Sequence, residues 1–600
     1  MPSEASREKR SKKLLIAVGL AAFVIRLVYL AQLVSAPFFH LRLGDAEAYH
    51  QWALQIAGGD WMGQQVFYQA PLYPYFLSAI YSVLGEGVAF VRLVQAALGA
   101  GSCVLLAAAG IALFGRRGAI AGVLLAVYPS AIFFDGLLEK TALTTFLTCS
   151  LLYVLSERRL KFREFLAGSI LGLLALTREN AILLAIPVSL WFVIGERRQA
   201  RVAVAAFVGG CALVLMPVAV RNFMVGGELH LTTSQFGPNF YIGNHAGARG
   251  LYEPLVPGRG NAEAEREDAT RLAEEASGHP LSPEQVSEYW SSRAFEFIGA
   301  QPVAWGAQLA RKLALTYNAV EIADTESQEV YAEQSPLLRA LSPFTFGVLF
   351  CGAAFGAVMT IGEFRRLWFV YAIVLTYTVS VVVFYVFARY RIPLVPMLML
   401  LAAGATATLR EPCARPLRTR ALAAAVLAAV LAHLPLETTR MDRISHYVSV
   451  GNLLLPYSQH WDQADAFYAR ALEESPNDPA AHYGMGMLLA LRQQPRKALE
   501  HYRIAVAGWD GNADVHVNYA LALADVGDAT RAFAELEAGE QRRPIGQAPY
   551  VLLGNLMLKQ YRPSEAAKAF TRALEIEPGD PHARSGMKET EILLMHSRQQ

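Results

Sequence analysis

The hydrophobic residues of this chain are concentrated in long runs that short polar segments separate. About 20 helical residues are needed to cross roughly 30 Å of hydrocarbon, and about eleven of the runs approach that length. They lie near residues 14–34, 88–114, 118–134, 141–156, 165–177, 181–195, 202–220, 342–361, 367–388, 392–409 and 420–436. The pattern predicts an all-α fold that begins as a polytopic transmembrane helical bundle.

The connections between these runs alternate between two kinds along the chain. One kind is short and basic and comprises REKRSKK, GRR, ERRLKFR, GERRQAR, GEFRR and REPCARPLRTR. Because basic connections stay on the cytoplasmic side, the N-terminus is predicted to be cytoplasmic. An odd number of spans then places the C-terminal part outside. We therefore expect a multi-pass inner (plasma) membrane protein whose outer face carries the loops 35–87 and 221–341.

The last part of the chain repeats with a 34-residue period. Small residues recur at three positions of the repeat. The first column is Ala464, Ala498, Ala532 and Ala566, the second is Ala471, Ala505, Gly539 and Ala573, and the third is Asn452, Gly486, Ala520 and Gly554. A separate column of prolines contains Pro476, Pro544 and Pro578. Small residues let two helices approach closely, and proline ends the second helix of each unit. The pattern predicts about four tetratricopeptide (TPR) repeats in an α-solenoid. The expected domains are 1–436 and 437–600, and the repeats either bind a peptide or partner protein or carry no ligand.

Composition and charge support the membrane prediction. Hydrophobic residues make up 54% of the chain, and the net charge is only +2, so no bulk attraction to nucleic acid is implied. The five cysteines are Cys103, Cys149, Cys211, Cys351 and Cys413. Their spacing indicates neither a disulfide framework nor a structural zinc. The first apolar run is long for a signal peptide and is read as a retained helix.

Two carboxylates follow the first apolar run closely. Asp45 and Glu47 stand two residues apart in GDAEAY, at the start of the first outer loop. A carboxylate pair at a membrane exit can act as a general base or ligate a metal. The alternative is a helix N-cap, because Gly-Asp before a helical sequence is good capping chemistry. The loop ends with Pro71 and Pro74, which predict the start of another helix.

Several polar residues stand within the apolar runs or at their outer ends. Burying a cation in hydrocarbon is costly, so such residues usually face a polar cavity or a partner. They are Arg26, Arg92, Glu139, Lys140, Arg178, Glu179, Asn180, Arg221, Asn222, Arg389, Tyr390 and Arg391. The alternative is that individual members are interfacial anchors, and snorkelling to the interface suits Arg92 better than Arg26. Together they supply cations and carboxylates at one depth, as needed to hold a phosphate on a lipid.

The large outer loop contains one segment that is expected to be ordered and two expected helices. Residues 232–252 are dense in Gly, Asn and aromatic residues, which predicts an ordered, turn-rich segment that includes Asn244. His245 is either a metal ligand or, as is more common for a lone loop histidine, solvated. Helices are predicted near 284–298 and 302–320, with mixed faces suited to the membrane surface.

Taken in order, these motifs resemble the membrane glycosyltransferases of the GT-C fold. The closest branch contains the protein O-mannosyltransferases and aminoarabinose transferases, and external TPR repeats add a likeness to the membrane mannosyltransferases that modify cadherins. The resemblance covers roughly residues 10–435. It is carried by GDAEAY (44–49), YQAPLYP (68–74), LLEK (137–140), LTREN (176–180), VRNF (220–223), GPNFYIGN (237–244) and FARYRIPLVP (387–396).

The resemblance implies inverting transfer of a sugar from a polyprenyl phosphate to an acceptor hydroxyl. Asp45 takes the position of the base, and Glu47 would assist it or bind metal. Candidates for holding the donor phosphate are Lys140, Arg178, Arg221, Arg389 and Arg391. The substrate cavity is expected to include Arg26, Arg92, Tyr68, Gln69, Glu139, Glu179, Asn180, Asn222, Asn244 and Tyr390. Tyr68 and Gln69 stand where aminoarabinose transferases carry a Glu-Lys pair, so a zinc site of that kind is not carried over.

The expected activity is therefore that of a hexosyl or pentosyl transferase dependent on a polyprenyl-phosphate sugar. No cofactor is firmly implied, with a divalent metal as the one candidate. The expected partners are the lipid-linked donor, membrane lipid and an acceptor protein or glycan recruited by the repeats. The competing interpretation is a non-catalytic, membrane-anchored TPR scaffold for envelope assembly. A scaffold gives no reason for Asp45 and several arginines to stand at membrane depth on one face. A transporter fits less well, because the tight hairpins and one-sided loop favour lateral lipid access.

Overall fold

The computed structural model describes residues 4–195, 199–227, 230–256, 259–260, 262–324, 326–408, 415–437 and 440–599. Helices are the only regular elements among these residues. The chain divides into two compact units. The first comprises Met1–Glu253 with Asn261–Asp442, and the second comprises Arg443–Gln600 with the short segment Pro254–Gly260. The predicted all-α class is therefore confirmed.

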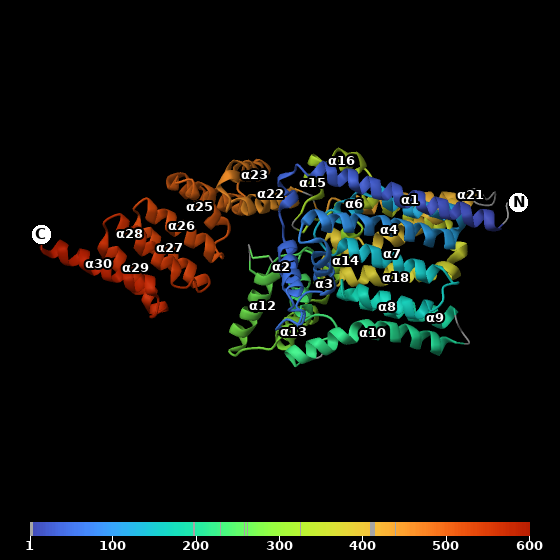
Figure 1. The fold of residues 1–600 in the computed structure, drawn as a ribbon, viewed down its shortest axis with the longest axis horizontal. Coiled ribbons are helices and arrows are strands. Elements are labelled where there is room, and N and C mark those ends of the chain that lie inside the picture. Colours follow the sequence, from blue (N-terminus) through green and yellow to red (C-terminus); the bar gives the residue numbers. More distant parts are fainter. Residues whose placement is uncertain are drawn as a thin grey trace. The chain divides into compact units, whose positions relative to one another are not determined.

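The first unit contains the apolar helices, which run alongside one another in Figure 1. Within the described residues, four helical stretches are long and apolar enough to cross a membrane: Glu8–Leu33, Val88–Ala126, Ala200–Gly226 and Ile361–Val382. The bundle helices are α1 (Glu4–Leu33), α4 (Val88–Phe114), α7 (Thr141–Ser156), α8 (Arg163–Ala175), α9 (Ala185–Gly195), α10 (Ala200–Gly226), α17 (Phe346–Met359), α18 (Phe364–Val382), α20 (Leu394–Thr408) and α21 (Arg415–Ala432).

Glycines set the closest contacts within the bundle. Helix α8 packs against α10, and the two backbones meet at Gly168 and Gly210. A Cβ on Gly168 would collide with the Phe207 carbonyl, and one on Gly210 would collide with the Phe165 carbonyl. Such approaches are typical of membrane helices, whose association depends on close packing because lipid is as apolar as a side chain.

The predicted span 118–134 is not one helix. It is divided into α5 (Ile120–Ala126) and α6 (Pro129–Asp135), and Tyr128 between them is extended, with φ −79° and ψ 115°. The residue before a proline is disfavoured in the helical region, so Pro129 accounts for the break. The run predicted at 367–388 also ends early, because α18 stops at Val382 and α19 (Ala388–Arg391) follows a short non-helical segment.

The loops 35–87 and 221–341, which were expected on the outer face, are helical as well. The first loop contains η1 (Pro37–His40), α2 (Asp45–Ala57) and α3 (Leu72–Leu84), and α3 begins directly after Pro71 as expected. The second contains α11 (Phe236–Gly243), α12 (Ala262–Ser277), α13 (Pro283–Ala300), α14 (Pro302–Thr316), α15 (Gln328–Gln334) and α16 (Pro336–Leu341). Helices α13 and α14 confirm the two helices predicted in this loop, whereas α12 was not predicted.

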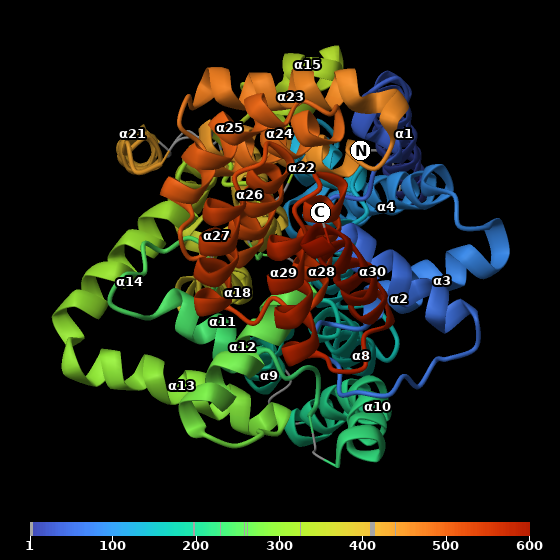
Figure 2. The same cartoon turned by 90° about the vertical axis from the view of Figure 1, so that its left-hand side faces the viewer.

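The second unit is a stack of helical hairpins, seen from two sides in Figures 1 and 2. Its helices are α22 (Arg440–Leu454), α23 (Trp461–Glu474), α24 (Pro479–Leu491), α25 (Pro495–Gly508), α26 (Ala513–Asp525), α27 (Ala529–Arg542), α28 (Ala548–Lys559), α29 (Pro563–Ile576) and α30 (Pro581–Gln599). The helices α24 and α25, α26 and α27, and α28 and α29 pack as pairs. This arrangement confirms the predicted TPR solenoid.

The small-residue columns have the structural role expected from the period. Ala498, Ala532 and Ala566 are fully buried in the solenoid core. Gly554 faces the ring of Phe570, where a Cβ would stand only 2.7 Å from a ring carbon. The first repeat carries Asn452 in the same column, and its side chain accepts a hydrogen bond of 2.7 Å from Tyr468.

Candidate active site

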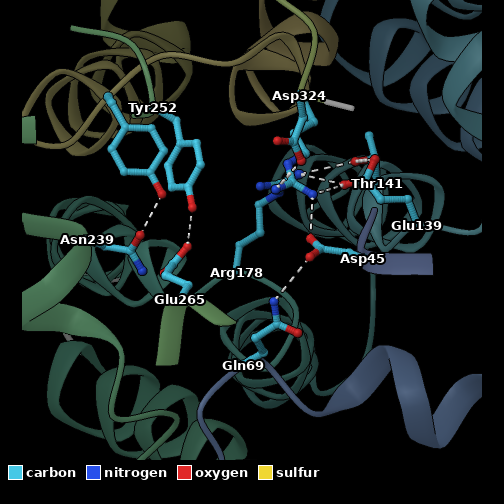
Figure 3. A network of polar contacts seen from close by, with 11 residues as sticks. Asp45, Gln69, Glu139, Thr141, Arg178, Asn239, Tyr252, Glu265 and Asp324 are labelled. Carbon is cyan, nitrogen blue, oxygen red and sulfur yellow. Dashed lines mark hydrogen bonds and ion pairs between the residues drawn. The ribbon is translucent and has the colours of Figure 1, made fainter. Parts of the chain in front are cut away.

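The first residue of α2 provides the carboxylate around which the site is built. The N-cap of α2 is Gly44, with a positive φ of 57°, and no side chain caps the helix. Asp45 is therefore not a cap, and the capping alternative is wrong. Its carboxylate instead accepts from the Arg389 guanidinium at 2.8 Å and from the Gln69 amide at 3.4 Å (Figure 3).

Arg389 brings together three carboxylates from three separate segments. Its Nη1 contacts Asp45 at 2.8 Å and Glu139 at 3.4 Å, and its Nη2 contacts Asp324 at 2.6 Å. Phe387, just before α19, is extended, and this geometry places Arg389 on the first turn of the short helix. One cation facing three anions leaves a net negative charge. Arg389 is therefore already paired with carboxylates and is poorly available to bind a phosphate.

The charges around Arg389 affect its two aspartates differently. Burial raises the pKa of Asp45, but the ion pair with Arg389, the charge of Lys140 and the hydrogen bond from Gln69 together outweigh it, so the pKa of Asp45 lies below the usual value. Burial, opposed by Arg389 and reinforced by the neighbouring carboxylates, raises the pKa of Asp324 to about 6. Asp45 is therefore ionised at neutral pH, whereas Asp324 titrates near physiological pH.

A second pair of cations lies beside this cluster. Arg178 donates to Thr141 at 3.1 Å, and its Nη2 stands 3.9 Å from Glu139, while its Nε has no hydrogen-bond partner among the described residues. Lys140 is buried, and burial lowers its pKa. The ring of Tyr390 lies 5.1 Å from the guanidinium of Arg178 and 5.4 Å from that of Arg389. These cations carry fewer carboxylate contacts than Arg389.

A cavity opens next to Asp45, with about 540 Å³ of empty space including its mouth. Its wall combines apolar side chains of the α6 region, such as Phe133 and Leu138, with a ring of carboxylates. The acidic residues are Asp45, Glu139, Glu321, Asp324 and Glu326. The last three come from the loop between α14 and α15, which the sequence did not single out. The cavity can accept a polar group close to the Asp45 carboxylate.

Arg391 holds this acidic loop in place. Its side chain is fully buried, pairs with Glu321 at 2.8 Å and donates to the backbone oxygens of Leu315, Thr316, Asn318 and Val320. Arg391 was expected to bind a donor phosphate, yet the structure commits its guanidinium to the loop backbone. Its planar set of donors suits this anchoring role.

A second buried carboxylate joins the outer loops on the other side of the site. Glu265 on α12 accepts from Tyr252 at 2.7 Å (Figure 3). It also accepts from Tyr68 at 3.1 Å. Tyr385 donates to Asn239 at 2.5 Å close by. Burial raises the pKa of Glu265, while the two tyrosine hydroxyls lower it. Tyr68 thus contacts the region of the site through its hydrogen bond to Glu265. The sequence did not indicate Glu265, because it stands in a helix that contains many charged residues.

Glu47 and the two arginines of the early helices are not brought to this cluster. Glu47 has an exposed side chain that accepts from Gln51 at 2.6 Å and Arg42 at 3.4 Å. Arg26 pairs with Asp135 at 2.6 Å inside the bundle. Arg92 is buried and donates to the backbone oxygens of Gly136 and Phe39, so the snorkelling alternative is wrong for it.

The remaining predicted residues bind neighbouring segments. Arg221 donates to Met62 O, with its guanidinium 3.7 Å above the Phe67 ring, and Asn222 donates to two backbone oxygens of the 230–232 segment. Asn244 donates to Phe240 O and Val383 O. Glu179 accepts from Thr233 and Gln235, and Asn180 donates to Ser380. These contacts tie the outer loops to the bundle.

Among the described residues, no group of three or more His, Cys, Asp and Glu side chains has an arrangement suited to a metal ion. Asp45 and Glu47 point to different partners, so the pair does not form a ligand set. His245 stacks against Tyr241, with ring centroids 5.2 Å apart. Among the cysteines, the four described ones are free, and Cys413 lies outside the described residues.

The comparisons with known proteins agree with the glycosyltransferase resemblance. Residues 68–221 match the family described as dolichyl-phosphate-mannose-protein mannosyltransferase. The matched stretch contains YQAPLYP, LLEK and LTREN, so the resemblance inferred from those motifs is confirmed there. No curated protein sequence matches the chain.

Three solved structures are similar to parts of this chain. ArnT from Cupriavidus metallidurans bound to undecaprenyl phosphate shares 13% identity over 93% of this chain and 79% of its own, with a TM-score of 0.37. YrrB, a TPR protein with an unusual peptide-binding site, shares 20% identity over 28% of this chain and 83% of its own, with a TM-score of 0.22. The Cut9-Hcn1 structure of the APC/C shares 12% identity over 87% and 98%, with a TM-score of 0.23.

Proposed function

We propose that this membrane protein is an inverting glycosyltransferase that moves a hexosyl or pentosyl group from a polyprenyl phosphate to an acceptor hydroxyl on the outer face of the inner membrane. One observation carries the proposal. Asp45, Glu139 and Arg389 converge on one cavity beside the cations Arg178 and Lys140, although they come from segments far apart in the sequence. The family match on residues 68–221 supports the donor class.

Asp45 has the properties of the general base in this reaction. Its carboxylate is ionised, lines the cavity and stands at the N-terminus of α2, where the helix dipole favours negative charge. The acceptor oxygen attacks the anomeric carbon of the sugar while Asp45 takes its proton. The bond from the anomeric carbon to the phosphate oxygen breaks, and its electron pair leaves with the lipid phosphate. Attack opposite the leaving group inverts the anomeric centre.

Arg178 and Lys140 are the cations best placed to stabilise the leaving phosphate. Arg178 keeps an unpartnered buried Nε, and Lys140 is the buried neighbour of Glu139 in the hairpin before α7. Cations aimed at growing negative charge lower the barrier to departure. Arg389, by contrast, is engaged by three carboxylates, and we assign it to orienting Asp45.

Replacing Arg178 or Lys140 by alanine is expected to weaken use of the donor. A hydrogen bond to a charged group contributes about 1.5–3 kcal/mol, so kcat/KM for the lipid-linked donor should fall about 10- to 100-fold. Steady-state kinetics against donor concentration measure the change. Arg116→Ala, an exposed arginine of the α4–α5 connection, is the matched control. If a variant has unchanged donor kinetics, the replaced cation does not bind the donor phosphate.

The assignment of activity is tested directly on the purified protein. The protein is incubated with a panel of polyprenyl-phosphate sugars, and consumption of each donor is measured with Asp45→Asn as the blank. Consumption of at least one donor above the blank is the expected result. If every donor survives equally in both samples, the protein is not this enzyme, and the scaffold interpretation gains support.

The TPR unit is proposed to recruit the acceptor or an associated partner. Repeats contact mainly their neighbours, so removing the whole array costs the membrane unit little. Cutting the chain after Glu437 should leave slow donor hydrolysis intact while transfer to the natural acceptor is lost. A bound acceptor gains effective concentration near the site, and truncation removes only that gain. Loss of donor hydrolysis would instead make the repeats part of the catalytic fold, and unchanged natural transfer would assign the groove to another partner.

A further inference from the structure

Asp324 contacts Arg389 but has no role in the proposed reaction of Asp45. It lies in the loop between α14 and α15 and contacts Arg389 Nη2 at 2.6 Å, while Asp45 contacts Arg389 Nη1 at 2.8 Å. The two aspartates therefore bind different nitrogens of one guanidinium. Both also line the cavity. Asp324 competes directly with Asp45 for the positive charge of Arg389.

The loop holds Asp324 there by contacts on both sides. Ala388, next to Arg389, donates its backbone N–H to Ile322 O at 2.7 Å. Arg391 pairs with Glu321 at 2.8 Å, and Tyr331 donates to Glu326. The segment carrying Asp324 is thus fastened to the helix that carries Arg389 and to α15. These contacts hold the backbone on the N-terminal side of Asp324 close to Arg389.

From this geometry we infer that Asp324 is a positioning residue that shares Arg389 with Asp45 and thereby keeps Asp45 basic enough to accept the acceptor proton. The inference rests on the proposed function of Asp45. An arginine bound to Asp45 alone would stabilise the ionised carboxylate strongly and make it a weaker base. A second anion on the same guanidinium offsets part of that effect.

Other charged groups also face the two aspartates. Asp45 faces Arg389 and Lys140, and Asp324 faces Arg389, Asp45, Glu139 and Glu265. Glu326, whose pKa burial raises to about 7, lines the same cavity. Asp324 is the member of this set whose pKa is raised to about 6. As the pH falls through this range, Asp324 takes up a proton and its negative charge disappears. Arg389 then acts on Asp45 with less competition, and the base is weakened.

The pH dependence of transfer tests the inference. In the wild type, kcat/KM is expected to fall from neutral pH to below about 6 and to level off at a lower plateau. Asp324→Asn should show the plateau value throughout, roughly tenfold below the wild type at neutral pH, because one unit in the pKa of a base is a factor of ten in proton affinity. Asp324→Glu should restore the pH-dependent step, and Asp60→Asn, an exposed aspartate of the first outer loop, should leave it unchanged.

Three results would overturn the inference. The first is an Asp324→Asn profile that follows the wild type. The second is a loss as complete as that of Asp45→Asn, which would make Asp324 itself the base. The third is a loss of melting temperature and activity that Asp324→Glu does not repair, which would show a structural anchor only.

An infrared titration of the carboxyl band separates failure of this inference from failure of the proposed function, because it needs no substrate. The step that belongs to Asp324 is the extra protonation near pH 6 in the wild type relative to Asp324→Asn, because Glu326, whose pKa burial raises to about 7, titrates in both proteins. This step should be present in the wild type and Asp45→Asn and absent in Asp324→Asn. If this step is seen while no donor is consumed, the proposed activity fails and the Arg389 sharing stands. If donors are consumed but this step is missing, the proposed activity stands and only the inference that Asp324 shares Arg389 with Asp45 is wrong.

Discussion

Replacing Asp45 by asparagine is expected to lower sugar transfer by about 10²–10⁴-fold, the usual contribution of a general base. Asparagine keeps the size of the side chain and can still meet Gln69, but it cannot accept a proton. Arg389 retains Glu139 and Asp324 as ionic partners, so the guanidinium is not left uncompensated. The change should therefore act on the chemical step and leave the fold nearly unaltered.

The measurement compares kcat with melting temperature and donor binding for the same variant. Asp60→Asn makes the same substitution in the same loop, at a carboxylate whose contact is the Gly63 backbone N–H at 2.9 Å. Its activity should match that of the wild type. Asp45→Asn activity within a few-fold of the wild type would show that another group accepts the proton, and the base would then have to be sought among Glu139 and Asp324.

The second large effect is expected at the buried pair between α1 and α6. Arg26 and Asp135 meet at 2.6 Å with side chains that are 1% and 5% exposed. Removing one member leaves the other as an uncompensated charge within the bundle. Asp135→Leu or Arg26→Leu alone should therefore cost about 3–5 kcal/mol of stability, as breaking a buried ion pair typically does.

The matched control is the double variant Arg26→Leu with Asp135→Leu. Replacing both members with apolar residues removes the desolvation cost together with the attraction, so most of the lost stability should return. Denaturation of the detergent-solubilised protein, followed by helicity, measures all four forms. If the double variant is as unstable as the singles added together, the two residues act independently. The stability lost in Arg26→Leu would then come from a contact other than the one with Asp135.

The sequence allowed the helices and repeats to be predicted because each rests on a local period. Apolar runs and a 34-residue repeat are visible in any one segment. Departures from the expected spans include the break at Pro129 within 118–134 and the end of α18 at Val382. Asp45 was also recognisable, since a carboxylate at a membrane exit is unusual on its own. These features need no knowledge of which distant segment lies opposite.

The partners of the charged residues could not be predicted in this way. Arg26 was notable inside an apolar run, but its partner Asp135 lies 109 residues away, in a segment read as a loop. Arg391 resembles Arg389 in the sequence, yet Arg391 binds four backbone oxygens and one carboxylate, whereas Arg389 binds three carboxylates. Asp324 and Glu265 stand among many acidic residues in stretches that look like ordinary solvated surface. Only their neighbours in space distinguish them.

The wide separation of Asp45 and Arg389 along the chain, 344 residues, has a consequence for biosynthesis. At about 5–20 residues added per second, the ribosome needs roughly 17–70 s to extend the chain from the first residue to the second. During that interval Asp45 and Glu139 lack the Arg389 guanidinium that contacts both, and Asp324 joins them only shortly before Arg389. The nascent protein thus passes most of its membrane insertion before its site can close.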